Sequence, residues 1–205
     1  MWVPIALSRD IPRGVTRAVI LEGKELVIWR GEAGSAQVWE DRCPHRGMRL
    51  SFGFVRGNSL NCLYHGWEYG AGASCGRIPA HPDLIVPPTI KAKAFASTET
   101  GGMIWVNLGE TPETPPVFLA GRPIASLAIA SDIGTVLALA GGMPQAGVQL
   151  FETSLDGVPL SIGWHMPAPG KVMLHVVALD PGNVESRALV ALHQLRAQAE
   201  ERVAA

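Results

Sequence analysis

The sequence predicts a mainly β fold, α+β overall, in which a small antiparallel β-sandwich precedes a strand-rich segment that ends in an α-helix. The first half of the 205-residue chain consists of short apolar runs separated by glycine turns, which is typical of antiparallel strands joined by hairpins. Three prolines without apolar periodicity occupy residues 109–117, and apolar residues recur at helical spacing near the C-terminus. We therefore expect two domains, residues 1–110 and residues 111–205.

The expected strands of the first domain follow from alternating apolar runs and turn residues. Residues 16–41 contain three candidate strands, and residues 58–69 form a hairpin with residues 73–79. Residues 90–109 form another hairpin, with the glycine pair of residues 100–102 at its tip.

The second domain is expected to contain three strands and one helix. The strands are expected within residues 147–155, 158–166 and 171–179, which are apolar runs separated by glycine or proline turns. Residues 184–203 repeat leucine and alanine at helical spacing, with Asn183 as the expected N-cap.

Composition excludes several classes of partner. The net charge is −1, with no clustered basic run, so neither nucleic acid nor an anionic membrane surface is an expected partner. Pro4 and Arg9 interrupt the apolar N-terminus, which does not resemble a secretory signal. Arg122 and Asp132 divide the long apolar stretch of residues 117–142 into pieces too short to span a bilayer. No membrane partner is expected.

Two short cysteine–histidine pairs carry the chemistry of the first domain. Cys43 and His45 are separated by one residue, Cys62 and His65 by two, and sixteen residues lie between the pairs. A [2Fe–2S] cluster with two cysteines on one iron and two histidines on the other needs one ligand of each kind from each of two loops. The pattern favours such a cluster.

The alternative for the same four residues is a structural zinc site. Zinc sites usually open with two cysteines separated by two to four residues, and this chain has no such pair. Gly47 and Gly66, which follow the two histidines, allow backbone N–H groups to approach cluster sulfides. Cys75 then has no disulfide partner, which indicates a reducing compartment, and we expect a cytoplasmic protein with Cys75 as a small buried apolar residue.

These motifs also carry a family resemblance. The segment CPHRGMRLSFGFVRGNSLNCLYHGWEY, followed by IPAHP and GMIWVNLGE, resembles the N-terminal Rieske domain of Rieske non-heme iron oxygenases, in particular vanillate and dicamba O-demethylases. The resemblance covers residues 1–110. It implies a Rieske antiparallel β-sandwich with a two-loop cluster-binding subdomain. One [2Fe–2S] cluster per chain would be bound by Cys43, His45, Cys62 and His65.

Residues beside the motifs suggest a low reduction potential. High-potential respiratory Rieske proteins carry an additional cysteine in each loop and a serine after the second His-Gly, where this chain has Met48, Tyr64 and Trp67. We therefore expect no disulfide across the cluster and no hydroxyl group that donates to a cluster sulfide. Fewer hydrogen bonds imply a potential near the low end of the Rieske range, about −150 mV.

The second half departs from the family pattern. The oxygenases carry a helix-grip domain whose mononuclear iron ligands begin with Asp-x2-His-x4-His, and this chain has only 96 residues after Gly109. Counted from Asp156, the two histidine positions fall on Pro159 and Trp164. Residues 111–205 therefore resemble a truncated helix-grip segment without the mononuclear iron motif.

Three functions are consistent with these residues. The first is a Rieske protein that transfers single electrons within an aromatic-ring hydroxylating or O-demethylating system. Its expected partners are an NAD(P)H-dependent flavin/iron–sulfur reductase and either an oxygenase-like subunit or its own copy. The alternative is a terminal oxygenase whose unusual iron site uses His165, His175 and either Asp156 or Glu152. The third is a structural or redox-sensing cluster.

Other polar residues have simpler expected roles. His165 and His175 lie in apolar strands, where a hydrogen-bonded structural histidine is more usual than a metal ligand. His193 is expected on the helix surface and His81 in a loop near the cluster. Arg46 could either steer a redox partner or form a surface ion pair.

Overall fold

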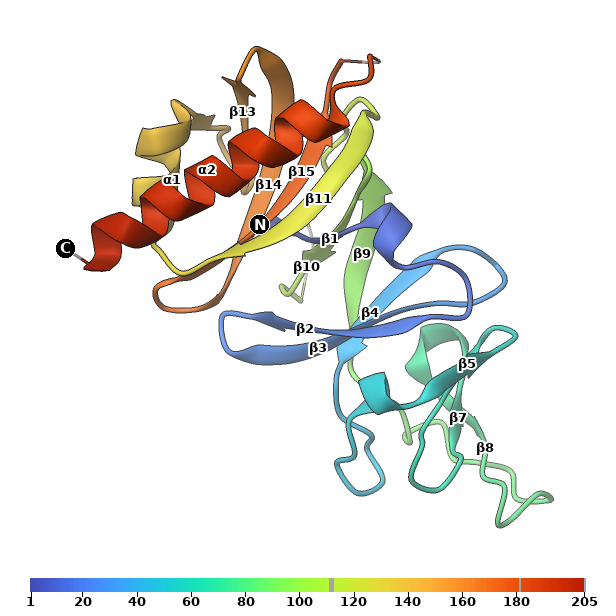
Figure 1. Cartoon of the computed structure of the whole chain (residues 1–205). Coiled ribbons are helices and arrows are strands. Elements are labelled where there is room, and N and C mark those ends of the chain that lie inside the picture. The colour runs from blue at the N-terminus through green and yellow to red at the C-terminus, as the bar shows by residue number, and fades with distance from the viewer. Residues whose placement is uncertain (111–112, 181, 205) are drawn as a thin grey trace. The chain divides into compact units, whose positions relative to one another are not determined.

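The computed structural model describes residues 1–110, 113–180 and 182–204, which are drawn in Figure 1. Contacts divide the chain into two compact units. The loop unit contains Ile11–Ile20 and Lys24–Ser97, and the sheet unit contains Met1–Asp10, Leu21–Gly23 and the chain from Thr98 onward. This division differs from the two expected domains, whose boundary between residues 110 and 111 stays a prediction. Residues 111 and 112 of the expected linker lie outside the described residues.

The loop unit contains the strands expected in residues 16–41 and the hairpin expected around residues 58–79. Antiparallel strands β2, β3 and β4 lie side by side, and β4 also pairs with the first residues of β9. A second sheet has the strand order β5-β6-β7-β8. The elements are β2 (Thr16–Leu21), β3 (Lys24–Arg30), β4 (Ala36–Glu40), the 3-10 turn η2 (Leu50–Phe52), β5 (Phe54–Arg56), β6 (Ser59–Asn61), β7 (Glu68–Tyr69), the 3-10 turn η3 (Ala71–Ala73), β8 (Cys75–Arg77) and β9 (Ala94–Thr100).

The core of the loop unit is aromatic and contains all three cysteines. The rings of Trp29 and Trp39 pack edge to face with centroids 4.9 Å apart, an arrangement that aromatic pairs prefer. The other buried side chains of this cluster include Val27, Leu50, Leu60, Tyr69, Ile78, Cys43, Cys62 and Cys75. The cysteines are therefore held by a packed interior.

The sheet unit contains the three strands and the helix expected in residues 147–203, and the second strand of the hairpin expected in residues 90–109, whose first strand begins in the loop unit. Four strands and helices of this unit were not predicted, namely β1, β11, β12 and α1. A five-stranded antiparallel sheet has the order β11-β15-β14-β13-β12, and β1 pairs with β10. The elements are β1 (Trp2–Leu7), the 3-10 turn η1 (Ser8–Asp10), β10 (Met103–Asn107), β11 (Arg122–Ile129), α1 (Ile133–Ala140), β12 (Met143–Pro144), β13 (Leu150–Leu155), β14 (Val158–Ala168), β15 (Lys171–Ala178) and α2 (Glu185–Ala204).

Helix α2 lies across the five-stranded sheet beside α1, as Figure 1 shows. Its buried residues Ala188, Leu192, Leu195 and Ala199 join the sheet core, so the predicted apolar face is confirmed in outline. The helix begins at Glu185, which makes Val184 the N-cap position, and the prediction of Asn183 is wrong by one residue. No helix among the described residues is long and apolar enough to cross a membrane.

Gly53, between η2 and β5, offers a test of packing against β6. A Cβ at this position would overlap the carbonyl oxygen of Asn61 and lie 2.9 Å from that of Leu50. Because backbone atoms cannot move aside easily, we expect Gly53→Ala to lower the free energy of unfolding by about 1–3 kcal/mol in urea titrations. The matched control is Gly76→Ala in β8, where no atom lies within 4 Å and the loss should stay below about 0.5 kcal/mol. Equal losses in the two variants would contradict this account.

Candidate functional site

Two loops of the loop unit share one backbone arrangement. The N–H of Cys43 donates to the Met48 carbonyl (2.8 Å), and the N–H of Gly47 donates to the Cys43 carbonyl (2.8 Å). The second loop repeats both bonds, from Cys62 to the Trp67 carbonyl (3.0 Å) and from Gly66 to the Cys62 carbonyl (2.9 Å). Residues 43–48 and 62–67, called the cluster loops below, are thus closed in the same way despite their different cysteine–histidine spacing.

The two glycines make this closure possible. Gly47 and Gly66 have φ angles of 74° and 68°, in the left-handed region that residues with a Cβ adopt at a cost. Each glycine turns the chain back just after the histidine, so that its N–H reaches the carbonyl of the cysteine. The expectation that these glycines let backbone N–H groups approach cluster sulfides stays a prediction.

The structure brings the two cysteines together in the interior. Cys43 and Cys62 are each 2% exposed, and Cys43 is among the groups that act on the Cys62 thiol. Burial raises the pKa of the Cys62 thiol, as does Cys43, whereas backbone N–H groups of Tyr64 and His65 donate to its sulfur and lower the pKa. Amide donors of this kind stabilise a thiolate, which is the form that binds iron.

A tyrosine hydroxyl also reaches one of these sulfurs. The hydroxyl oxygen of Tyr69 in β7 lies 3.1 Å from Cys43 Sγ. Burial, followed by contact with Cys43, raises the pKa of Tyr69, so its hydroxyl keeps its proton and is able to donate a hydrogen bond to Cys43 Sγ when that sulfur is a thiolate. The expectation that no hydroxyl group donates to a cluster sulfide concerned the serine position, which is Trp67, and it stays a prediction. The Tyr69 hydroxyl, two residues further on, reaches a cysteine sulfur and was not predicted.

The two histidines lie together at the outer end of the loops. The ring centroids of His45 and His65 are 4.7 Å apart, and His45 stacks on Trp67 at 4.2 Å with an angle of 6° between the planes. His65 is exposed and rests against Tyr64, with centroids 3.8 Å apart. Desolvation lowers the pKa of His45, and the neighbouring His65 and Arg46 lower it further, so the ring favours its neutral form. Neutral imidazoles are the form that binds metal.

A comparison of the sequence with protein families agrees with this arrangement of buried cysteines and outward histidines. The profile of the Rieske [2Fe-2S] domain matches residues 1–91. Residues 1–91 form a Rieske [2Fe–2S] domain. The resemblance inferred from the motifs is confirmed, and so is the cofactor, because Rieske domains bind a [2Fe–2S] cluster. The residues fit the group: two sulfurs with amide and hydroxyl donors lie on one side, and two imidazoles lie on the other.

Curated relatives match the same part of the chain. Oxidoreductase NdmD of Pseudomonas putida is 44% identical over 115 residues, which are 56% of this chain and 20% of NdmD. Methylxanthine N1-demethylase NdmA of the same species is 40% identical over 113 residues, and the 3-chlorobenzoate-3,4-dioxygenase oxygenase subunit of Comamonas testosteroni is 31% identical over 127. These matches cover 52% and 60% of this chain, and 32% and 29% of the two relatives. The chain therefore spans about a third or less of their lengths.

Solved structures extend the likeness in fold to the whole chain. Pseudomonas putida NdmA with caffeine has a TM-score of 0.75 at 18% identity, covering 98% of this chain and 80% of NdmA. Dicamba monooxygenase bound to dicamba has a TM-score of 0.69 at 16% identity, covering 98% of this chain and 84% of the other. The predicted fold class, a mainly β Rieske fold followed by strands and a C-terminal helix, is confirmed.

The remaining candidates of the loop unit lie apart from the cluster loops or on the surface. Cys75 is buried, with its thiol 3.6 Å from the Arg77 carbonyl oxygen, and all three cysteines of the chain are free. The absence of a disulfide across the loops was predicted. His81 lies in an exposed loop, and Arg46 is exposed beside His45. In the sheet unit, His193 is exposed on α2.

His165 and His175 form a buried hydrogen-bonded pair in the sheet unit. His165 Nδ1 lies 3.1 Å from His175 Nε2, and His175 Nδ1 lies 2.9 Å from the Ser126 hydroxyl, which is 3.3 Å from Asp10 Oδ2. Burial lowers the pKa of His165 to about 4 and that of His175 well below its usual value. Both rings are neutral, as expected of structural histidines.

The iron site of the alternative hypothesis is not assembled around this pair. Asp156 lies in the turn between β13 and β14, largely exposed and 3.7 Å from Arg187, and Glu152 is exposed on β13. Among the described residues, no three histidine, cysteine, aspartate or glutamate side chains gather in a single-metal arrangement. His165 and His175 contact each other and Ser126 in place of a carboxylate.

The Tyr69 hydroxyl should raise the reduction potential of the cluster. A hydrogen bond to a ligand sulfur stabilises the reduced state, and a bond worth about 0.5–1.5 kcal/mol corresponds to roughly 20–65 mV for one electron. We expect Tyr69→Phe to lower the potential by about this amount in a redox titration followed by visible absorbance. Tyr64→Phe is the control, since its exposed ring lies against His65 and not against a cysteine. A Tyr69→Phe potential equal to that of the unchanged protein would show that the hydroxyl does not act on the cluster.

The buried histidine pair should make the stability of the protein depend on pH. The folded-state pKa of His165 is about 4, whereas an unfolded histidine titrates near 6.5, so the unfolded chain takes up protons first as pH falls. The contribution of neutral, buried His165 to the free energy of unfolding is fully present above pH ~6.5. It is lost as the pH falls toward ~4, by up to about 3 kcal/mol for His165 alone. Urea titrations between these pH values should show that the free energy of unfolding changes less with pH in His165→Gln than in the control His193→Gln, which changes an exposed histidine. Equal slopes would contradict the prediction.

Proposed function

We propose that this chain transfers single electrons through its Rieske cluster within an aromatic-ring hydroxylating or O-demethylating oxygenase system. Cys43 and Cys62 would bind one iron, and His45 and His65 the other. The observation that supports this most directly is the separation of the two pairs, with the thiols buried and the imidazole rings side by side at the surface. The bound cluster supplies a one-electron carrier.

The surface around the histidines is suited to contact with a redox partner. Leu63 and Tyr64 in the second cluster loop are 59% and 54% exposed, next to His65. Exposed apolar side chains at a redox site favour a contact that excludes water. An NAD(P)H-dependent flavin/iron–sulfur reductase would deliver the electron here, and an oxygenase-like subunit or a second copy of this chain would receive it, in the cytoplasm.

The names of the relatives agree with this proposal. NdmD is called an oxidoreductase, and NdmA and the Comamonas protein are called a demethylase and an oxygenase subunit. Electron transfer is favoured over the terminal-oxygenase alternative, because His165 and His175 hydrogen-bond to each other while Asp156 and Glu152 face solvent.

The ligand assignment is tested by two cysteine substitutions in the same core. Cys62→Ala should abolish cluster assembly, reducing about two irons and two acid-labile sulfides per chain to background, because the thiolate is a direct ligand. Cys75→Ala is the control, since Cys75 is buried in the same unit but lies outside the cluster loops, and it should keep the visible spectrum and the iron content. A coloured, iron-loaded Cys62→Ala protein would show that the assignment is wrong.

The same preparation tests the electron-transfer role. The loaded chain should accept one electron from a flavin reductase in stopped-flow absorbance and should form no product from O2 when it is alone. A reproducible third iron that is lost in His165→Ala, together with product formation by the unchanged protein, would instead support the terminal oxygenase.

A further inference from the structure

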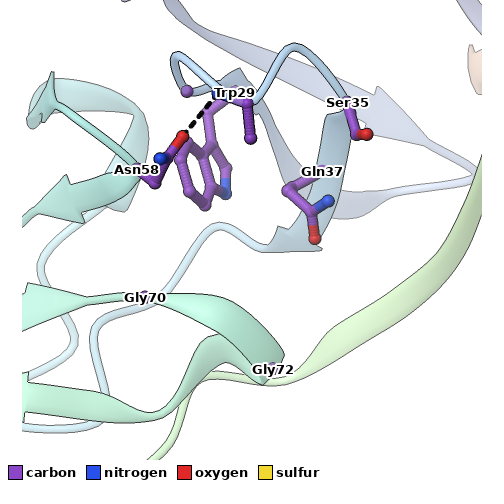
Figure 2. A pocket seen from close by; sticks show the side chains of 8 residues that line it. Trp29, Ser35, Gln37, Asn58, Gly70 and Gly72 are labelled. Carbon is purple, nitrogen blue, oxygen red and sulfur yellow. Dashed lines mark hydrogen bonds between the residues drawn. The ribbon is translucent and has the colours of Figure 1, made fainter.

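A pocket of about 350 Å³ opens in the loop unit away from the cluster loops. Figure 2 shows the residues that surround it, among them Trp29, Ser35, Gln37, Asn58, Gly70 and Gly72. None of its eight lining residues belongs to residues 43–48 or 62–67, so the proposed electron-transfer role does not account for it.

The walls of the pocket are held by specific contacts. The N–H of Ala33 donates to Asn58 Oδ1 (2.6 Å), and the N–H of Glu32 donates to the Gly57 carbonyl (3.0 Å). Gly31 permits this approach, because a Cβ there would lie 2.8 Å from Asn58 Oδ1. The turn after β3 and the turn after β5 are therefore joined, and the pocket between them is preformed.

One buried donor in this pocket has no partner. The indole of Trp29 is 3% exposed, and among the described residues its Nε1 has no hydrogen-bond acceptor. Figure 2 shows the ring extending into the pocket with its nitrogen on the side of Gln37. Buried N–H groups are nearly always paired, because an unpaired one loses the hydrogen bond that water would give it. An acceptor supplied by a bound molecule would satisfy this N–H.

The lining also restricts what that molecule can be. None of the eight lining residues carries a charge, so an ion would lose hydration without gaining a counter-charge. The glycines at residues 70 and 72 leave this wall free of side chains, and a Cβ at Gly72 would meet no atom within 4 Å. The Ser35 hydroxyl and the Gln37 amide are available as further polar contacts.

We propose that this pocket binds a small uncharged planar molecule, such as an aromatic amide, ketone or lactam, whose carbonyl oxygen accepts from the Trp29 indole N–H. Trp29 packs on Trp39, and both rings belong to the buried cluster that includes Cys43 and Cys62. A molecule in the pocket would therefore contact the same packed interior that holds the cluster sulfurs.

The proposal is tested with the cluster-loaded protein and three neutral probes, benzamide, acetophenone and 2-pyridone, in saturation-transfer NMR and calorimetry. We expect at least one of them to bind with a dissociation constant near or below about 1 mM. Benzoate, which has the shape of benzamide but a negative charge, should bind at least about tenfold more weakly. If none of the neutral probes binds at about 10 mM, or if benzoate binds as well as benzamide, the proposal is wrong.

Two variants decide whether the indole N–H makes the contact. Trp29→Phe keeps an aromatic ring but removes the donor, and it should raise the dissociation constant of the probe about tenfold. Trp39→Phe is the matched control, since Trp39 is equally buried, also has an unpartnered indole N–H, and does not line the pocket. Both proteins must first show the visible spectrum of the unchanged cluster. Equal affinities in Trp29→Phe and Trp39→Phe would overturn the assignment.

A third variant tests the location without changing the core. Gly70→Leu places a side chain at the pocket, where the nearest atom to a new Cβ is Ser59 Oγ at 3.9 Å. Probe binding should be lost while the spectrum and stability are kept. Undiminished binding in a folded Gly70→Leu protein would place the probe elsewhere.

Discussion

The cluster-binding part of this protein depends on the repeated backbone closure of its two loops. In each loop a glycine with positive φ donates to the carbonyl of the cysteine, while the cysteine N–H donates to a carbonyl five residues further along. These bonds orient both cysteines toward the interior. The two loops are closed by the same bonds at the same positions, so the difference of one residue in cysteine–histidine spacing lies entirely inside the loops.

The site has a steep change of environment from one side to the other. On the inner side, the two thiols lie among buried aromatic residues, with Tyr69 and backbone amides as the available donors. On the outer side, the imidazoles stack on Trp67 and Tyr64 and reach the surface. A charge change at the cluster would therefore be stabilised mainly by fixed dipoles on one side and by water on the other, since the two media differ greatly in dielectric constant.

The sequence was most informative where chemistry restricts spacing and least informative where contacts depend on register. The two cysteine–histidine pairs, together with the glycines after them, were recognisable because few other patterns serve a two-iron cluster. The Tyr69 contact was missed, because it depends on which way a side chain of the short strand β7 points. The signals for α1 were present, since Asp132 caps its start and Gly141 ends it in the left-handed conformation, but its apolar composition resembled that of the strand before it.

The histidine pair was also beyond the reach of sequence patterns. His165 and His175 meet because β14 and β15 pair with Gly163 opposite His175, a register that no local motif specifies. The second half was expected to be a truncated helix-grip segment, which stays a prediction, and the likeness in fold to NdmA covers 98% of this chain. Tertiary pairing, more than local propensity, determines these features.

The buried histidine chain has a consequence for where its protons reside. The ring of His165 donates to the Pro4 carbonyl, and because its Nδ1 faces His175, the donating atom is Nε2. A neutral ring has a single N–H, so Nδ1 must accept from His175 Nε2, which leaves His175 Nδ1 without a proton and facing the Ser126 hydroxyl. That hydroxyl has one proton and also lies 3.3 Å from Asp10 Oδ2, so it can donate to His175 or to Asp10 but not to both at once. The bonds from His175 to His165 and from His165 to Pro4 point the same way along the chain, and each polarises the other. Both rings are thereby held in the same tautomer, because the Pro4 carbonyl can only accept.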